Sequence, residues 1–250
     1  MKKPARGGPE KTGHLRGLGC ALDGGFRGSV GLAMLVSHAR KFIFLKTKKT
    51  AGTSVEIFFE RYCRPAHMAG TEEHGCPEQI YSEGIVGRRS ADVIGARWYN
   101  HMPAAAVREQ IGDEIWASYF KFCTVRNPFD RLVSEWWHFV PKNRTDTFPD
   151  IKHQFCEWIE SVSEIPSSRA IYCIDGAICV DEVIRHERLT DDILAVSRRL
   201  GIADDPARLG SYKGDIRKRP EHYRLYYTPT ARARVEVGCR DELEAFSYEF

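Results

Sequence analysis

The feature that most constrains the fold of this chain is a short apolar run that leads directly into a lysine-rich loop. Residues 42–45 (FIFL) are continuously apolar, which is typical of a strand buried on both faces of a sheet. Residues 46–53 contain lysine, threonine, alanine and glycine, and residues 54–62 carry apolar side chains at helical spacing. A strand, a phosphate-type loop and a helix in this order begin a nucleotide-binding α/β domain.

A second unit of the same kind lies later in the chain. Residues 119–125 (YFKFCTV) predict another buried strand, which ends at Arg126, Asn127 and Pro128. Residues 129–139 then have helical character. The two units together indicate a sheet whose strands are followed by helices.

The remaining elements are predicted from periodicity, turn residues and helix caps. They are a weak strand over 92–96, helices over 103–111, 155–162 and 189–200, a hairpin over 171–184 around Asp175-Gly176, and two closing helices broken near Gly238, whereas residues 64–90 have no clear period. Because no repeat or linker interrupts this pattern, we expect one α/β domain with three layers and a central parallel sheet.

The first part of the chain differs from the rest in composition. Residues 1–33 are rich in glycine, lysine and arginine and have no apolar period, so we expect a disordered extension before a folded domain over residues 34–250. The apolar run at residues 30–36 is far shorter than the roughly 18 residues of a membrane span. No cleavage site follows it, so we expect neither a signal peptide nor a stable membrane anchor.

Charge and cysteine usage exclude several classes of function. The 37 basic and 34 acidic residues leave a net charge of only +3, which does not indicate a nucleic-acid partner. The eight cysteines form no C-x-x-C pair, so we expect free thiols in a reducing compartment and a cytoplasmic protein. His74 and Cys76 lie close together, but no second pair accompanies them, so we expect no metal site.

The loop over residues 46–54 (KTKKTAGTS) has the chemistry of an anion site. The first N–H groups of a helix are unpaired and carry positive partial charge, and Gly52 lets an oxyanion approach the backbone. The loop is not a Walker A motif, because its lysines precede the glycine. A nucleotide-dependent kinase-like transferase is therefore a weaker alternative function. The loop could also have a purely structural role, as a basic turn with a Thr or Ser helix cap.

The second unit also carries a group suited to phosphate. Arg126 lies at the end of a predicted strand, and Ser134 follows about two helical turns later. A guanidinium can bind a phosphate monoester through two hydrogen bonds, and a serine hydroxyl can add a third. Taken alone, Arg126 could instead cap the sheet edge beside the helix that begins at Pro128.

Together, the two motifs resemble those of the sulfotransferases that use 3′-phosphoadenosine 5′-phosphosulfate (PAPS). The resemblance is to the branch that contains carbohydrate O-sulfotransferases and many bacterial enzymes of the sulfotransferase family 2 type, which carry P-K-T-[GA]-G-T-S and later R-N-P-x-x-R-x-x-S. Residues 42–54 match the first motif without gaps, except that Lys48 stands where the family has proline, and residues 122–134 match the second motif completely. The similarity extends over roughly residues 34–250.

This resemblance implies a P-loop-like sulfotransferase fold, PAPS as donor, 3′-phosphoadenosine 5′-phosphate (PAP) as product, and no metal. It assigns Lys49 to the 5′-phosphosulfate and its bridging oxygen, and it leaves open whether Lys46 or Lys48 shares that role. The implied donor-binding residues are Lys46, Lys48, Lys49, Thr50, Ala51, Gly52, Thr53, Ser54, Arg126, Ser134, Lys213 and Gly214. Of these, Gly52, Thr53 and Ser54 would cradle the 5′-phosphate. Arg126 and Ser134 would hold the 3′-phosphate. Residues 213–219 resemble a late basic loop that closes over the nucleotide, or are a solvated charge run.

The acceptor hydroxyl needs a base, and the resemblance points to His101, which lies between the two phosphate motifs. His101 could instead cap the helix that begins near Pro103, and Glu56 and Glu135 are possible replacements as the base. Four aromatic side chains could line the acceptor pocket, although core packing is an alternative for the last two: Trp98, Tyr99, Trp136 and Trp137.

The acceptor itself is a small molecule or a carbohydrate. The resemblance favours a carbohydrate hydroxyl. A small natural-product alcohol or phenol is the alternative, because it would need the same PAPS-binding residues. The oligomeric state is left open.

Overall fold

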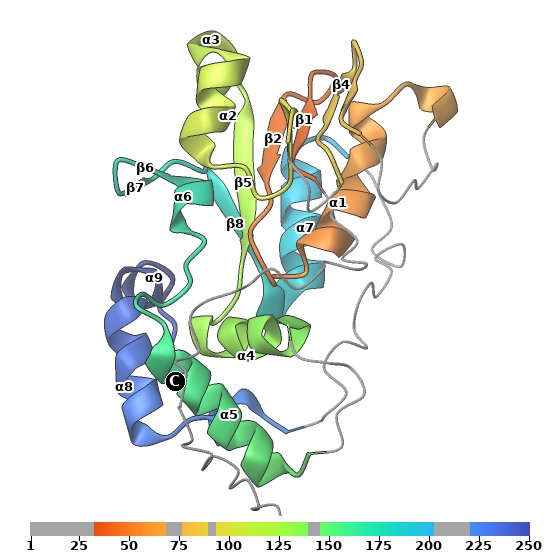
Figure 1. The fold of residues 1–250 in the computed structure, drawn as a ribbon. Coiled ribbons are helices and arrows are strands. Elements are labelled where there is room, and N and C mark those ends of the chain that lie inside the picture. The colour runs from red at the N-terminus through yellow and green to blue at the C-terminus, as the bar shows by residue number, and fades with distance from the viewer. Residues whose placement is uncertain (1–32, 69–76, 90–93, 140–145, 203–220) are drawn as a thin grey trace, which may run out of the picture.

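The computed structural model describes residues 33–68, 77–89, 94–139, 146–202 and 221–250 of the 250-residue chain, and Figure 1 shows their arrangement. The strands of the described part are β1 (Leu35–Ser37), β2 (Phe42–Leu45), β3 (Gln79–Ile80), β4 (Gly84–Val86), β5 (Phe120–Val125), β6 (Cys173–Ile174), β7 (Ala177–Ile178) and β8 (Glu182–Arg185). The α-helices are α1 (Gly52–Phe59), α2 (Ala104–Ile111), α3 (Asp113–Ser118), α4 (Pro128–Phe139), α5 (Phe148–Ser161), α6 (Arg169–Tyr172), α7 (Leu189–Arg199), α8 (Pro229–Gly238) and α9 (Arg240–Phe246). Four short 3₁₀ helices complete the described elements: η1 (Glu60–Cys63), η2 (Ala66–Met68), η3 (His186–Arg188) and η6 (Tyr223–Tyr226).

The described strands form a six-stranded sheet in the order β3-β4-β1-β2-β5-β8. β2, β5 and β8 are parallel, whereas β1, β3 and β4 pair in antiparallel fashion. The expectation of a central parallel sheet is therefore wrong for half of the strands. The reason is chain length, because only residues 38–41 join β1 to β2, and a parallel crossover needs a dozen residues or more.

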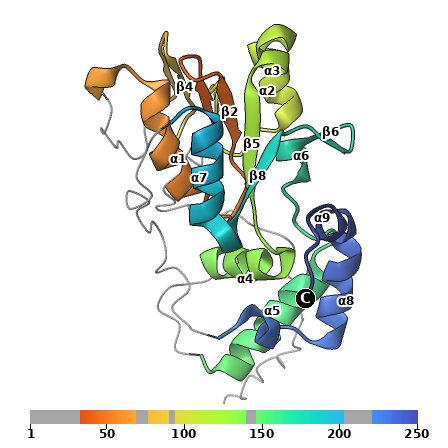
Figure 2. The same ribbon diagram turned by 180° about the vertical axis from the view of Figure 1, so that it is seen from behind.

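β2 is buried along its whole length and β5 from Lys121 to Val125, and their side chains alternate between two cores. Phe42 and Phe44 of β2 pack with residues of α1 and α7, while Ile43 and Leu45 pack with residues of α2, α6 and α9. Figures 1 and 2 show the sheet between these two groups of helices. The three-layer α/β arrangement follows from this alternation.

A third core lies beyond the carboxyl ends of the parallel strands. It joins buried side chains of α4, α5, α8 and η6, among them Phe129, Phe155 and Tyr226. In both views α4 crosses below β5 and β8, with α5 and α8 farther down (Figures 1 and 2). The helix that follows the second motif therefore closes one end of the sheet.

Several predicted elements are confirmed with shifted ends. They are β2, β5, α1, α2, α4, α5, α7, α8, α9 and the β6–β7 hairpin. In that hairpin Asp175 and Gly176 both have positive φ, as a two-residue primed turn requires.

The strand predicted over 92–96 is wrong in its described part. Residues 94 and 95 form a turn and residue 96 is irregular. Gly95 adopts a φ of +72°, which an extended strand does not allow. The sequence reading also missed β3 and β4, which lie in the segment that it took as irregular, and it missed α3. Two or three strand residues are too few to show an alternating period.

Two further observations concern the chain as a whole. No helix among the described residues has the length and apolar character to cross a membrane. Six cysteines in the described part are free thiols, namely Cys63, Cys123, Cys156, Cys173, Cys179 and Cys239.

The extension predicted over residues 1–33 falls almost entirely outside the described residues, and its one described residue, Ala33, is buried.

Candidate functional site

The candidate site lies where three parallel strands end side by side. β2 is hydrogen-bonded to β5, and β5 to β8, all in parallel register. Their carboxyl ends therefore bring together the loop after Leu45, Arg126 after β5 and His186 after β8. In α/β sheets this edge is where ligands bind, because the loops after the strands gather there.

The loop between β2 and α1 has a special backbone. Lys49 and Ala51 both adopt left-handed conformations, with φ of +59° and +61°. Among the described residues no side chain caps the start of α1, and its first turn has no acidic residue. The N–H of Ser54 donates to the carbonyl oxygen of Ala51 at 3.0 Å. The start of a helix carries positive partial charge, which favours an anion near Gly52 and Thr53.

Three buried hydroxyl groups fasten this loop to β5. Thr50 shares hydrogen bonds with the hydroxyls of Thr47 (2.8 Å) and Thr124 (2.6 Å). Thr47 also donates to the carbonyl oxygen of Thr124. The side chain of Thr50 is thus turned into the protein, so any contact of this residue with the donor would come from its backbone.

Lys46 lies at the base of the loop and is buried. Its Nζ is 2.9 Å from Oε2 of Glu56 on α1. The side chain of Lys46 lies against Gly52, where an added Cβ would be only 2.8 Å from Lys46 Cγ. A side chain at this position would therefore force Lys46 to shift.

The other two lysines of the loop differ from Lys46 in exposure. Lys48 is exposed, and its backbone N–H donates to Oγ of Ser168 at 3.3 Å. Lys49 is half-buried, and its carbonyl oxygen accepts from Nη1 of Arg126 at 3.1 Å. The structure thus joins the first motif to the second through the backbone of Lys49.

Arg126 is held by a carboxylate on the helix that follows it. Its Nε and Nη2 donate to Oδ2 of Asp130 at 2.9 and 2.6 Å. Residues four apart lie on the same face of a helix, so Ser134 lies one turn beyond Asp130 on that face of α4. Arg126 thus contacts the loop, and the joint binding of a 3′-phosphate by Arg126 and Ser134 stays a prediction.

His101 also contacts the loop. Its Nδ1 lies 2.9 Å from the carbonyl oxygen of Lys46, and its backbone is left-handed with φ of +57°. A carbonyl can only accept, so Nδ1 carries the hydrogen and Nε2 of the neutral ring has a lone pair. The alternative of a helix cap is not seen, because no side chain caps α2 among the described residues.

The two glutamates considered as replacement bases are both held by cations. Glu56 is completely buried and contacts Lys46 and Arg89. Glu135 is buried, and its Oε2 accepts from Nη1 of Arg131 at 3.0 Å. Both carboxylates are thus paired with cations and largely removed from solvent, which argues against either as the base.

The aromatic residues expected at the acceptor differ in burial. Trp98 is buried in the core beside the sheet, and Trp136 and Trp137 are buried in the core of α4, α5 and α8. Trp137 Nε1 donates to the hydroxyl of Tyr226 at 3.1 Å. Only Tyr99 remains half-exposed, so core packing holds for the three tryptophans.

The sequence reading missed two residues of this region. His186 follows β8, and burial and the positive charge of Arg126 lower its pKa. Ser168 is buried and meets the backbone of Lys48. No motif distinguishes either residue, and only the pairing of β8 with β5 could have pointed to His186. Lys213 and Gly214 lie outside the described residues.

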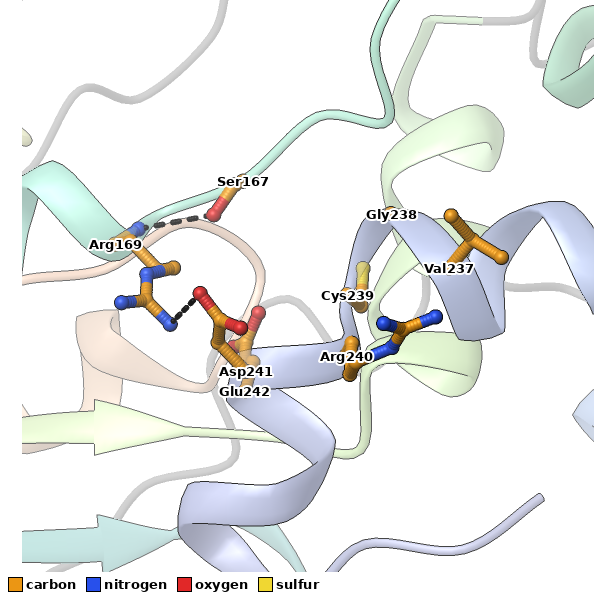
Figure 3. A pocket seen from close by; sticks show the side chains of 8 residues that line it. All are labelled: Ser167, Arg169, Val237, Gly238, Cys239, Arg240, Asp241 and Glu242. Atoms are coloured by element: carbon orange, nitrogen blue, oxygen red, sulfur yellow. Dashed lines mark hydrogen bonds and ion pairs between the residues drawn. The ribbon is translucent and has the colours of Figure 1, made fainter. Parts of the chain in front are cut away.

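A small cavity of about 80 Å³ lies near α8 and α9 (Figure 3). Its lining includes Arg169, which pairs with Asp241 at 2.9 Å, and no predicted donor-binding residue. Nucleotide-sized ligands occupy several hundred Å³, so this cavity is not the donor site. In the described ranges no group of three or more His, Cys, Asp or Glu side chains could hold a metal ion.

Comparisons with known proteins add an independent finding. A family model described as "Sulfotransferase family" matches residues 33–244, which is most of the chain. An uncharacterized protein of Archaeoglobus fulgidus is 26% identical over 106 residues, which cover 42% of this chain and 86% of that protein. No solved structure matches the chain significantly.

Proposed function

Because this chain belongs to the sulfotransferase family, it is a transferase of sulfuryl groups, and we propose that it moves the group from PAPS to a carbohydrate hydroxyl. One observation carries the proposal. The backbone carbonyls of the loop accept from both functional side chains, Lys46 from His101 and Lys49 from Arg126. Arg126, the proposed phosphate ligand, and His101, the proposed base, therefore both contact this loop.

The donor is proposed to bind along the strand ends. The uncapped N-terminus of α1, with Gly52, Thr53 and Ser54, takes the 5′-phosphate. Arg126 and Ser134 take the 3′-phosphate, which distinguishes PAPS from nucleotides without it. Among the described residues, the guanidinium uses three of its five N–H groups on Asp130 and Lys49, which leaves two for the phosphate.

The proposed chemistry is an in-line transfer through a loose transition state, analogous to phosphoryl transfer. The acceptor oxygen forms a bond to sulfur while the bond from sulfur to the bridging oxygen breaks. The electron pair of the broken bond goes to that oxygen, which leaves as part of PAP. Lys49 stabilises this developing negative charge, which is the role that an oxyanion hole has in acyl transfer.

His101 is proposed to take the proton of the acceptor hydroxyl on Nε2. The hydrogen bond from Nδ1 to Lys46 holds the ring in the required tautomer. General base catalysis contributes about 10²–10⁴ in rate. The products are then a sulfate ester, PAP and a protonated imidazole, which returns its proton to solvent.

The acceptor and the location remain proposals. A small natural-product alcohol or phenol would use the same donor half and is the second candidate, whereas a kinase-like activity would need a Walker A lysine that the loop lacks. We propose a cytoplasmic location, because the described cysteines are free thiols, as reducing compartments maintain.

Thermal unfolding tests the donor. PAP at about a hundredfold excess over its Kd should add about 2.7 kcal/mol to the free energy of unfolding. Magnesium ATP and an oligonucleotide should leave the melting temperature unchanged. If magnesium ATP stabilises the protein as much as PAP does, the donor proposal is wrong.

The acceptor is tested by mass spectrometry of a panel of sugars, alcohols and phenols incubated with PAPS and the protein. A mass gain of one sulfuryl group on sugars supports the carbohydrate proposal. Sulfation confined to phenols or small alcohols would replace it with the second candidate.

A further inference from the structure

A buried group of charges lies directly behind the loop, and the proposed mechanism does not use it. Glu56, which is 0% exposed, accepts from Lys46 Nζ at 2.9 Å and from Arg89 Nε at 3.0 Å. Lys46 and Arg89 are themselves 5% and 2% exposed. We call these three residues the buried ion triad. Charges buried in this way lose their hydration, so a triad is a poor means of adding stability.

The triad closes the loop across its base. Lys46 is the first residue after β2, and Glu56 lies in the second turn of α1. Their ion pair passes over Gly52, which has no room for a Cβ beneath the lysine. The two ends of the loop are therefore tied together below the residues that meet the donor.

The same lysine also supports the proposed base. Its carbonyl oxygen accepts from Nδ1 of His101, while its ammonium is held by Glu56. A movement of Lys46 would shift the imidazole and the loop together. Lys49, Ala51 and His101 hold left-handed backbone conformations, which persist only where the surroundings impose them.

We propose that Glu56 is a positioning residue for sulfuryl transfer. Through Lys46 it sets the distance between Lys49, which stabilises the leaving group, and His101, which takes the proton. Lys46 is then part of the support for the loop and does not contact the donor. This inference rests on the proposed function, and it answers which lysine of the loop acts on the donor.

The test uses three variants, Lys46→Met, Glu56→Gln and the double variant. Lys46→Met keeps the apolar stem over Gly52 and leaves Glu56 paired with Arg89. Each single variant should lower kcat at saturating PAPS by about ten- to a hundredfold, because a small misplacement near the reacting atoms has effects of that size. The double variant should be no slower than the slower single variant, because both changes remove the same support.

Calorimetry with PAP shows whether Lys46 only holds the loop in place or contacts the nucleotide directly. The Kd for PAP should stay within about threefold of wild type in Lys46→Met, since the lysine is not a ligand. A rise of ten- to a hundredfold, the size of a lost charge-assisted hydrogen bond, would overturn the proposal. This arm needs only Lys46→Met, so it remains decisive if Glu56→Gln does not fold.

Two controls complete the design. Lys46→Arg keeps the charge and the reach to Glu56 and should retain most of kcat. Glu60 lies one turn farther along the chain and pairs with Arg89 and Arg64, so Glu60→Gln removes a buried carboxylate of the same kind. Glu60→Gln should lower the melting temperature and leave kcat unchanged.

Two outcomes then have distinct meanings. If wild-type protein neither binds PAP nor turns over PAPS, the proposed function fails. If wild type does both, while Lys46→Met and Glu56→Gln lower only the melting temperature, as Glu60→Gln does, the triad is merely structural and this inference fails.

Discussion

Arg126 is the residue at which the two motifs meet. It contacts Asp130 of its own motif and the carbonyl of Lys49 in the other. Arg126→Ala should weaken PAP binding by about ten- to a hundredfold, because a charge-assisted hydrogen bond contributes about 1.5–3 kcal/mol. Calorimetry with PAP measures this, and a Kd within twofold of wild type would count against a 3′-phosphate site.

The ligand provides the matched control for this prediction. Adenosine 5′-phosphate lacks the 3′-phosphate, so wild type and Arg126→Ala should bind it with similar, weaker affinity. If the variant loses affinity for both nucleotides equally, Arg126 acts through the loop backbone and does not contact the phosphate.

Replacing Lys49 and replacing His101 should have different effects on kcat and on the affinity for PAP. Lys49→Ala should cut kcat strongly with a smaller change in PAP affinity, because its interaction is strongest in the transition state. His101→Ala should lower kcat by about 10²–10⁴ and leave the Kd for PAP unchanged. Steady-state kinetics and calorimetry on the same preparations make the comparison.

Acceptor acidity distinguishes a base from a structural histidine. An activated phenol loses its proton readily, so it should partly rescue His101→Ala but not Lys49→Ala. If His101→Ala keeps most of its activity with a less acidic alcohol, His101 is structural. The base would then have to be another group, and the burial of Glu56 and Glu135 argues against both.

At the scale of elements, the loop depends on its attachment to β5. Thr50→Val keeps the shape of the side chain but leaves the buried hydroxyl of Thr124 with one partner fewer. The loss should be about 1–3 kcal/mol in the free energy of unfolding. Ser197 on α7 is also buried, and among the described residues its hydroxyl has no partner, so Ser197→Ala should cost less. Urea unfolding of both variants gives the comparison, and equal losses would show that the threonine cluster has no special role.

The elements that the sequence predicted are those with a strong local signal. β2 is a continuous apolar run, β5 is mostly apolar, and α4 and α5 have clear amphipathic periods. β3 and β4 are too short for a period, and they exist because β1 offers an edge to which β4 can pair. Their formation depends on a neighbour distant in sequence, which no local pattern contains.

At the scale of the whole molecule, stability should depend on two histidines. Burial lowers the pKa of His38 below 6.5, and burial together with the positive charge of Arg126 does the same for His186, against the opposing charges of Glu187 and Asp130. The unfolded chain therefore takes up protons first as the pH falls. The free energy of unfolding should decrease as the pH drops below about 6.5.

Urea unfolding between about pH 7.5 and 5.5 measures this dependence. His186→Gln should reduce the slope, and the variant with both histidines replaced should reduce it further. An unchanged slope in the double variant would show that other groups control stability in this range.

The predicted extension can also be tested on the whole chain. The composition of residues 1–33 predicts that the domain does not need them. Residues 1–32 lie outside the described residues, whereas Ala33 is described and buried. A protein that begins at Ala33, which is buried, should keep its melting temperature and its Kd for PAP. An insoluble product, or one that loses PAP binding, would show that the segment belongs to the domain.

The sequence by itself determined the local units of this protein: two strands, the loop between strand and helix, and the order of the motifs. Hydrophobic runs, helix starts and glycine positions act over a few residues, so they can be read along the chain. Only the tertiary structure decided that β4 pairs with β1, that Glu56 holds Lys46 and that Arg126 meets Lys49. Those contacts join residues far apart in sequence or buried beneath a loop, and they form only when the sheet and its helices pack together.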